Sequence, residues 1–194
     1  MKTLIFILCT FLISSNFIYA HPHLFVDVDV SAIWENGKVS GFHHSWTFDR
    51  IFSSTMIPEF DADGNGKIDK DENKTAFSKG FSYSRRYNYF NSIKINGKRK
   101  KKIEIENFRA EIKKNQLLYE FFVPVGAEIS NLENISLAVF DPTYYTSFKF
   151  ENISEKGDKN KSCVLKKEKT LRHTISYGKV SMELLKIVCD SQKK

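Results

Sequence analysis

An acidic stretch, Asp61 to Glu72, has the residue types and the spacing of an EF-hand calcium loop. Gly66 stands at loop position 6, where the chain must turn sharply, and Ca²⁺ prefers oxygen ligands. The alternative is an Asx-rich turn that binds no metal. Because the sequence contains a single such loop, we expect a structural, weakly binding site rather than a sensor. The expected ligands, at positions 1, 3, 5, 7, 9 and 12, are Asp61, Asp63, Asn65, the carbonyl of Lys67, Asp69 and Glu72.

A second group of residues has the chemistry to bind a divalent transition metal. If the mature chain begins at His21, its α-amine and imidazole can chelate one ion, and His23 can reach the same ion. Imidazole ligands suit Zn, Ni, Co or Cu. Pro22 has no amide N–H, which excludes the square-planar mode that uses deprotonated backbone amides. The alternative is a frayed terminus beside ordinary strand residues. The candidates to complete the site are His43, His44 and Asp49.

The first twenty residues predict that the protein is exported. Met1-Lys2 precedes an apolar run from Leu4 to Ile13, and the small residue Ala20 follows, as in a secretory signal peptide. The run is shorter than the roughly 20 apolar residues of a membrane-spanning helix. We therefore expect residues 1–20 to be cleaved after Ala20, and residues 21–194 to form one periplasmic or secreted domain. An uncut membrane anchor is the alternative.

Composition excludes several classes of protein. With 17 Phe and 8 Tyr, the chain has too many aromatic residues for a disordered protein. Its net charge of +7 is modest, and its densest basic run, Lys98 to Lys102, follows an Asn-Gly turn signal and is typical of solvated surface. Nucleic acid is not an expected partner of an exported protein. The sequence has no Gly-rich phosphate loop, GxSxG or HExxH motif, so we expect no enzyme activity.

Two cysteines remain after signal cleavage, since Cys9 leaves with the signal peptide. Cys163 and Cys189 form an even pair in an oxidising compartment, which favours a disulfide. Paired thiolate metal ligands are the alternative, although the CxxC spacing is missing.

Hydrophobic periodicity predicts an α+β fold. Alternation over 21–30 and 39–49, with Asn36-Gly37 between them, indicates a hairpin in which His44 and Trp46 share one face and His43 the other. Segments 51–60 and 70–91 are predicted to be helical, with Pro58 bending the first. Further strands are predicted at 92–95, 103–105, 108–112, 117–125, 135–140 and 144–150, with an exposed loop at 155–161 and a strand or short helix within 174–189. The result is an antiparallel β-sandwich-like core with a helix–EF-hand loop–helix inserted at about 50–91.

Several of these motifs together resemble a family of bacterial periplasmic proteins commonly described as periplasmic components of ABC transporters. The resemblance covers most of residues 21 to 150 and rests on His-Pro-His-Leu-Phe from His21, Trp-Thr-Phe-Asp from Trp46, the acidic loop, Tyr87-Asn-Tyr-Phe-Asn and Asp141-Pro-Thr-Tyr-Tyr. Members accompany nickel, cobalt or zinc permeases in genomes. The resemblance implies a metal-binding accessory protein that acts beside a membrane transporter. The alternatives are a copper-dependent histidine-brace oxidase and a calcium-stabilised structural or adhesion domain.

Overall fold

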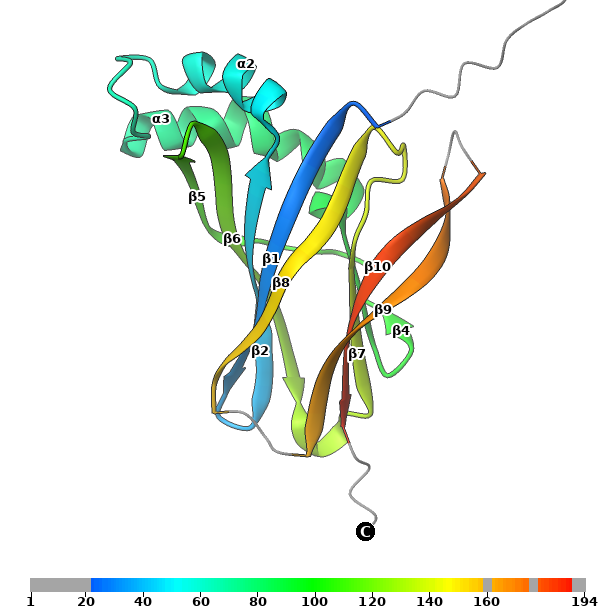
Figure 1. The fold of residues 1–194 in the computed structure, drawn as a ribbon. Coiled ribbons are helices and arrows are strands. Elements are labelled where there is room, and N and C mark those ends of the chain that lie inside the picture. Colours follow the sequence, from blue (N-terminus) through cyan, green and yellow to red (C-terminus); the bar gives the residue numbers. More distant parts are fainter. Residues whose placement is uncertain (1–21, 159–161, 175–177, 190–194) are drawn as a thin grey trace, which may run out of the picture.

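Two five-stranded sheets pack face to face in the computed structural model, which describes residues 22–158, 162–174 and 178–189 (Figure 1). The first sheet has the order β5 (Glu106–Lys113), β6 (Gln116–Glu128), β2 (Lys38–Phe48), β1 (Leu24–Glu35) and β8 (Thr146–Gly157). The second has the order β4 (Lys98–Arg99), β3 (Asn91–Ile95), β7 (Asn134–Val139), β10 (Gly178–Cys189) and β9 (Cys163–Thr174). The predicted α+β class with a sandwich-like pair of sheets is confirmed. The predicted signal peptide and His21 lie outside the described residues.

The predicted first hairpin is present, and its turn explains its register. β1 and β2 pair antiparallel, with Glu35 opposite Lys38. Asn36 and Gly37 both have positive φ, 50° and 73°, which matches the twist of the flanking strands in a two-residue turn. The period of two then buries Val26, Val28 and Val30 on the inner face of the sheet.

One strand pair differs from the antiparallel prediction. β1 lies between β2, its antiparallel partner, and β8, which runs parallel to it with Leu24 opposite Thr146. Parallel pairing requires a long crossover rather than a hairpin, and here most of the chain separates the two strands. Alternation of apolar residues defines the buried face of a strand but not its direction, so the sequence pattern could not reveal this pairing.

The core between the sheets contains large side chains from both layers. Trp46 and Phe121, at 2% and 0% exposure, lie edge to face with centroids 4.9 Å apart, an arrangement that aromatic rings favour. Ile93, Leu137 and Leu185 contribute the facing aliphatic surface from the second sheet. Each fully buried side chain of this size stabilises the fold by roughly 1.5–3 kcal/mol.

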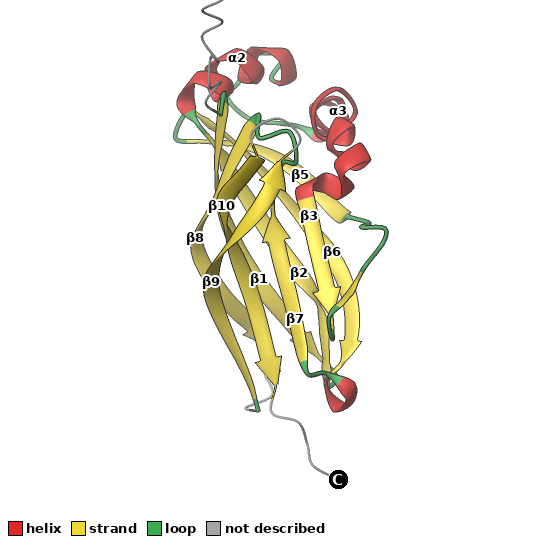
Figure 2. Ribbon diagram, turned by 90° about the vertical axis from the view of Figure 1, so that its right-hand side faces the viewer, coloured by secondary structure: helices red, strands yellow, loops and turns green. Residues whose placement is uncertain are grey.

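The helices of residues 50–90 gather at one end of the sandwich, above β5 and β6, whereas the short η3 (Ile129–Asn131) lies at the other end (Figures 1 and 2). α2 (Arg50–Phe60) includes Pro58 and ends at the acidic loop, and α3 (Lys70–Thr75) begins after it. The segment 70–91, which was predicted to be helical, consists of three short helical pieces rather than one α-helix. α3 is followed by a π-helical turn, η1 (Ala76–Gly80), and by a kinked 3₁₀ segment, η2 (Phe81–Phe90). η2 contains non-helical backbone at Tyr87, Asn88 and Tyr89, which ends the helical path.

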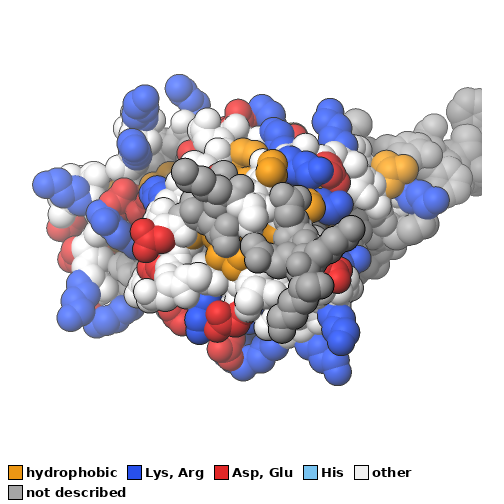
Figure 3. Space-filling view, turned by 90° about the horizontal axis from the view of Figure 1, so that it is seen from below, with side chains coloured by type: hydrophobic (Ala, Val, Ile, Leu, Met, Phe, Trp, Pro, Cys, Tyr) orange, Lys and Arg blue, Asp and Glu red, His pale blue; other side chains and the backbone are white. Residues whose placement is uncertain are grey.

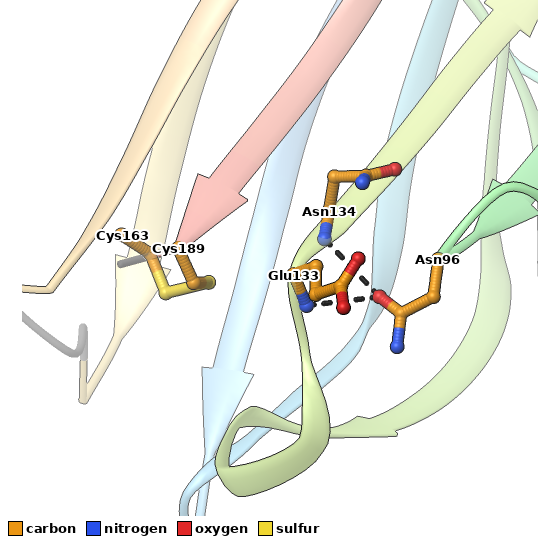
Figure 4. The surroundings of a disulfide bond; sticks show 5 residues. All are labelled: Asn96, Glu133, Asn134, Cys163 and Cys189. Carbon is orange, nitrogen blue, oxygen red and sulfur yellow. Dashed lines mark hydrogen bonds between the residues drawn. A yellow bond between two sulfur atoms is a disulfide. The ribbon is translucent and has the colours of Figure 1, made fainter. Parts of the chain in front are cut away.

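The C-terminal hairpin is cross-linked at its open end. Cys163 and Cys189 occupy opposite positions on β9 and β10 and form a disulfide, which confirms the predicted pair (Figure 4). Beside it, the side-chain oxygen of Asn96 accepts hydrogen bonds from the backbone N–H groups of Glu133 and Asn134 at 2.9 and 3.2 Å. These bonds connect the turn after β3 to the start of β7.

Three sequence assignments near the strands need correction. Residues 103–105 are not a strand, and β5 begins at Glu106. β8 continues to Gly157, so the loop that was predicted to begin at Glu155 begins three residues later, at Asp158. β9 was not predicted, because its charged run Lys166-Lys167-Glu168-Lys169 gives weak apolar periodicity. The ambiguous segment within 174–189 is the strand β10.

Candidate functional site

The acidic loop connects α2 to α3 and brings three carboxylates together. Oxygen atoms of Asp61, Asp63 and Glu72 all lie within 4.8 Å of one another. Asp61 immediately follows α2, whereas Glu72 is the third residue of α3. Both are only 8% exposed. Converging carboxylate oxygens at this separation could serve together as ligands of one cation.

Backbone hydrogen bonds give the loop its inward-facing shape. The two carboxylate oxygens of Asp61 accept the N–H groups of Asn65 and Gly66 at 3.1 and 2.9 Å. The side-chain oxygen of Asn65 accepts the N–H of Lys67 at 2.9 Å. Gly66 has φ +78°, a conformation that glycine adopts without steric penalty and other residues rarely do. The chain therefore wraps around the carboxylate of Asp61.

A reciprocal cap closes the loop at the start of α3. The carboxylate of Asp69 accepts the N–H groups of Asp71 and Glu72 at 2.8 and 2.9 Å. In return, Glu72 accepts the N–H of Asp69 at 2.9 Å and that of Ala62 at 2.8 Å. This capping box fixes the side chain of Glu72 across the loop, beside Asp61. The two ends of the loop are thereby held together.

The donor set fits a hard cation such as Ca²⁺. Asp61, Asp63 and Glu72 supply converging carboxylates, and all the cluster's members are oxygen donors. Asn65, Lys67 and Asp69 lie on the same loop, where further oxygens are available from side chains and backbone. The nearby cation Lys74 pairs with exposed Asp71 at 2.6 Å rather than with these carboxylates. A Ca²⁺ ion bound here would offset most of the negative charge of the cluster.

Both helices that flank the loop are attached to the first sheet. The Ser53 hydroxyl donates to the carbonyl of Phe48 and accepts the N–H of Leu117, which connects α2 to β2 and β6. The side chain of Asn73 bridges α3 to β5, because it donates to the carbonyl of Phe108 and accepts the N–H of Ala110 at 2.7 Å. Sequence periodicity gave no signal for either polar anchor.

His23 lies at the exposed start of β1, one position before the strand begins. The ring centroids of His23 and Tyr145 lie 5.2 Å apart, and the backbone N–H of His23 donates to the Tyr145 carbonyl at 2.9 Å. The neighbouring candidate ligand His21 lies outside the described residues. The described part of the chain therefore supplies one imidazole at this end of the sheet.

Asp49 lies close to the same end of β1. Its carboxylate accepts the N–H of Phe25 and that of Phe52, both at 2.9 Å. It therefore links the start of β1 to the N-terminus of α2, which it caps. Among the candidates on the second strand, Asp49 is the one that the fold brings toward His23.

His43 and His44 do not join this group. His43 pairs with Ser31, eight residues along β1 from His23, which corresponds to about 26 Å at about 3.3 Å per residue. His44 faces the opposite side of the sheet and is fully buried. Because adjacent strand residues point to opposite faces, the two rings cannot bind one ion together. The hypothesis that either residue completes a site with His23 is therefore corrected.

His44 instead belongs to the aromatic core. Its ring stacks on Phe121 at 4.8 Å, and its Nδ1 accepts a hydrogen bond from the indole of Trp46 at 3.4 Å. Within the described residues, its Nε2 has no hydrogen-bond partner. Burial, with a smaller contribution from neighbouring His43, lowers the pKa of His44 to about 3. The imidazole is therefore neutral near pH 7.

Fold and site together define a two-sheet β domain with an acidic loop held between two short helices. The chain belongs to the family described as "Protein of unknown function (DUF1007)", whose model matches residues 5–175. Among the described residues, no helix combines the length and the apolar character that crossing a bilayer demands.

Two relatives are similar to this chain. An "Uncharacterized protein" of Haemophilus influenzae is 30% identical over 139 residues, which is 71% of this chain and 66% of the relative. An "Uncharacterized 15.5 kDa protein in trpE 3'region" of Spirochaeta aurantia is 29% identical over 96 residues, which is 49% of this chain and 68% of the relative. The chain thus spans slightly less than two thirds of the Haemophilus protein.

Proposed function

We propose that the protein is an exported, calcium-stabilised accessory protein of a divalent transition-metal transport system. The observation that carries the calcium part is the convergence of Asp61, Asp63 and Glu72 within 4.8 Å between two anchored helices. The transport part is supported by the sequence resemblance and by the His-Pro-His segment that precedes β1 in the sequence. No enzyme activity is part of the proposal.

Calcium would join the two ends of the loop and thereby fix the helix pair on the sheet. Its ligands would be Asp61, Asp63, Asn65, the Lys67 carbonyl and Glu72, with Asp69 acting through water. A single loop outside the cell needs only the weak affinity of extracellular modules, roughly 10⁻⁴ to 10⁻³ M. At these concentrations the ion would act as a structural element rather than as a signal.

The calcium site is tested by titrating metal-free protein with Ca²⁺ and measuring heat and thermal stability. We expect Ca²⁺ to raise the Tm of the wild-type protein, and Glu72→Gln to weaken binding by at least about tenfold. Asp71→Asn is the matched control, because Asp71 lies one residue away but is exposed and paired with Lys74. Equal affinity in Glu72→Gln and Asp71→Asn would contradict the proposal.

The transition-metal site would form at the mature N-terminus. Its donors would be the α-amine and imidazole of His21 and the imidazole of His23, with Asp49 as the nearest carboxylate from the adjoining strand. Zn, Ni, Co and Cu are the candidate ions. The partner would be a membrane permease that receives or delivers the ion. Affinity should fall at low pH, because the ligands must be deprotonated.

Calorimetric titration of correctly processed protein with Ni²⁺, Co²⁺, Zn²⁺ and Cu²⁺ tests this site. We expect His23→Ala to reduce affinity by at least about tenfold, whereas His43→Ala, on a distant part of the sheet, leaves it unchanged. Unaltered binding in His23→Ala, or a mature chain that begins elsewhere than His21, would refute it.

A calcium-stabilised structural or adhesion domain is the second candidate. It is favoured by the bonds of Ser53 and Asn73, which connect the helices to the sheet and give the loop a purely architectural use. Normal metal transport in a strain with substituted His21 and His23 would support this candidate over the first.

A further inference from the structure

The net positive charge of the chain is concentrated in one short stretch. Residues 81–105 contain eight Lys and Arg and one Glu, a local net charge of +7 that equals the net charge of the whole chain. At the end of the sandwich opposite the helices, by contrast, Asp and Glu side chains lie among the Lys and Arg (Figure 3). Such a concentration of one sign attracts anions to this part of the surface.

The fold places a cavity of about 300 Å³ within this stretch. Arg86, from η2, and Arg99, from β4, both line it, although 13 residues separate them in the sequence. Apart from Pro142, its other lining residues are aromatic or polar: Tyr87, Asn88, Phe90, Asn91, Ser92 and Phe140. The cavity therefore combines two guanidinium groups with aromatic walls.

The backbone beside the cavity is held in an unfavourable conformation. Asn88, Tyr89 and Phe90 have positive φ values of 54°, 50° and 56°, although none of them is glycine. Such conformations cost on the order of 1–3 kcal/mol each and persist where surrounding contacts impose them, often at binding sites. One such contact is the 2.7 Å hydrogen bond from the N–H of Phe140 to the carbonyl of Phe90.

The same turn positions the basic run. The side-chain amide of Asn88 donates to the carbonyl of Lys101 and accepts the N–H of Ile103, each at 3.4 Å. The segment that contains Arg99 is thereby attached at its far end to the segment that contains Arg86. The basic run is therefore held beside the cavity by specific contacts rather than being an isolated solvated loop.

The two arginines remain available to a ligand. The guanidinium of Arg86 lies 5.1 Å from the ring centre of Tyr87. Across the described ranges, neither Arg86 nor Arg99 takes part in a salt bridge, and the one acidic residue of the stretch, Glu104, pairs with Lys102 at 2.6 Å. No carboxylate of the described chain therefore neutralises the arginines directly.

We propose that this cavity binds a phosphate group, with the guanidinium groups of Arg86 and Arg99 as its main contacts. The planar fork of arginine matches phosphate oxygens through paired hydrogen bonds. The local charge of +7 favours a phosphate over a singly charged carboxylate. The phosphate belongs either to a soluble ester or to an anionic phospholipid headgroup. The site does not depend on the acidic loop or on the N-terminal histidines.

The test uses the full mature protein at about 0.15 M salt, where the screening length is about 8 Å and distant surface charges contribute little. Glycerol 3-phosphate, with acetate as the carboxylate comparison, is titrated by calorimetry. Binding to phosphatidylcholine vesicles with and without phosphatidylglycerol is measured by sedimentation. The variant is Arg86→Gln/Arg99→Gln. Its matched control, Arg50→Gln/Lys169→Gln, removes the same charge from exposed positions elsewhere.

We expect the cavity variant to lose at least about tenfold in phosphate affinity and the control to lose less than about twofold. Arg86→Lys/Arg99→Lys keeps the charge and should still weaken binding, because the bidentate geometry is lost. Binding of glycerol 3-phosphate identifies a soluble ester, and binding confined to phosphatidylglycerol vesicles identifies a headgroup. Equal losses in the two glutamine variants, acetate binding as strong as phosphate binding, or no binding of either phosphate probe would overturn the proposal.

Discussion

Replacement of His44 by Leu should remove a defined part of the protein's sensitivity to acid. The wild-type imidazole is fully buried against Phe121 and has no partner for Nε2 within the described residues. Burial lowers its pKa from 6.5 to about 3. The unfolded chain therefore binds a proton at pH values where the folded protein does not. Leu has a similar volume and cannot be protonated.

The sign and size of the effect follow from this difference in pKa. Below pH 6.5 the unfolded state gains a proton and is stabilised, so the free energy of unfolding falls by about 1.4 kcal/mol for each pH unit until the folded state also protonates near pH 3. The loss amounts to about 5 kcal/mol over the full window and about 2.7 kcal/mol at pH 4.5. Above pH 6.5, His44 adds no pH dependence.

Urea denaturation of both proteins at pH 7.5, 6.5, 5.5 and 4.5 measures the effect. Carboxylates titrate in both proteins, so the difference between their unfolding free energies isolates His44. Between pH 7.5 and pH 4.5, we expect the free energy of unfolding of the wild type to fall by about 2–3 kcal/mol more than that of His44→Leu. His43→Gln, on the opposite face of β2, should retain most of the wild-type dependence of the unfolding free energy on pH. Parallel curves for His44→Leu and the wild type would refute the assignment of a neutral, desolvated imidazole.

Three further changes test the contacts that hold the domain together. Asn73→Ala should lower the free energy of unfolding by about 1–3 kcal/mol, measured by urea denaturation, because it removes both bonds between α3 and β5. Gly157→Ala should lower it by at least about 2 kcal/mol, because φ is +90° and the added Cβ would lie 2.0 Å from the Trp34 carbonyl oxygen; an unchanged urea midpoint would contradict this. Cys163→Ser/Cys189→Ser should cost about 3.5 kcal/mol from the 26-residue loop, and added reductant should then leave the Tm of this variant unaffected.

Local chemistry made the first hairpin and the acidic loop predictable from sequence. Asn36-Gly37 specifies a tight turn, and the alternation around it specifies which side of each strand is buried, His44 included. The spacing from Asp61 to Glu72 likewise anticipated the convergence of carboxylates, because the loop is defined by residues close in the chain. In both cases the interacting residues are close in the sequence, so their types and spacing were sufficient to predict the local structure.

The remaining features depend on partners that are distant in the sequence. The separation of His43 from His23 follows from the register of β1 on β2. The types of the residues alone do not specify this register. The predicted helical segment changes type after Thr75, packs Phe81 against Phe108 and ends in a left-handed turn at Asn88, and apolar periodicity indicates none of these features. The joining of Arg86 and Arg99 in one cavity depends on that same turn.

The parallel contact between β1 and β8 also determines when the protein can fold. The hydroxyls of Ser31 and Ser154, 123 positions apart, meet at 2.8 Å across these strands. β1, the first strand of the described residues, thus acquires one of its two neighbours only after more than a hundred further residues have been synthesised. Pairing of segments this far apart in the sequence forms slowly, so β1 and β8 can complete this sheet only late in folding.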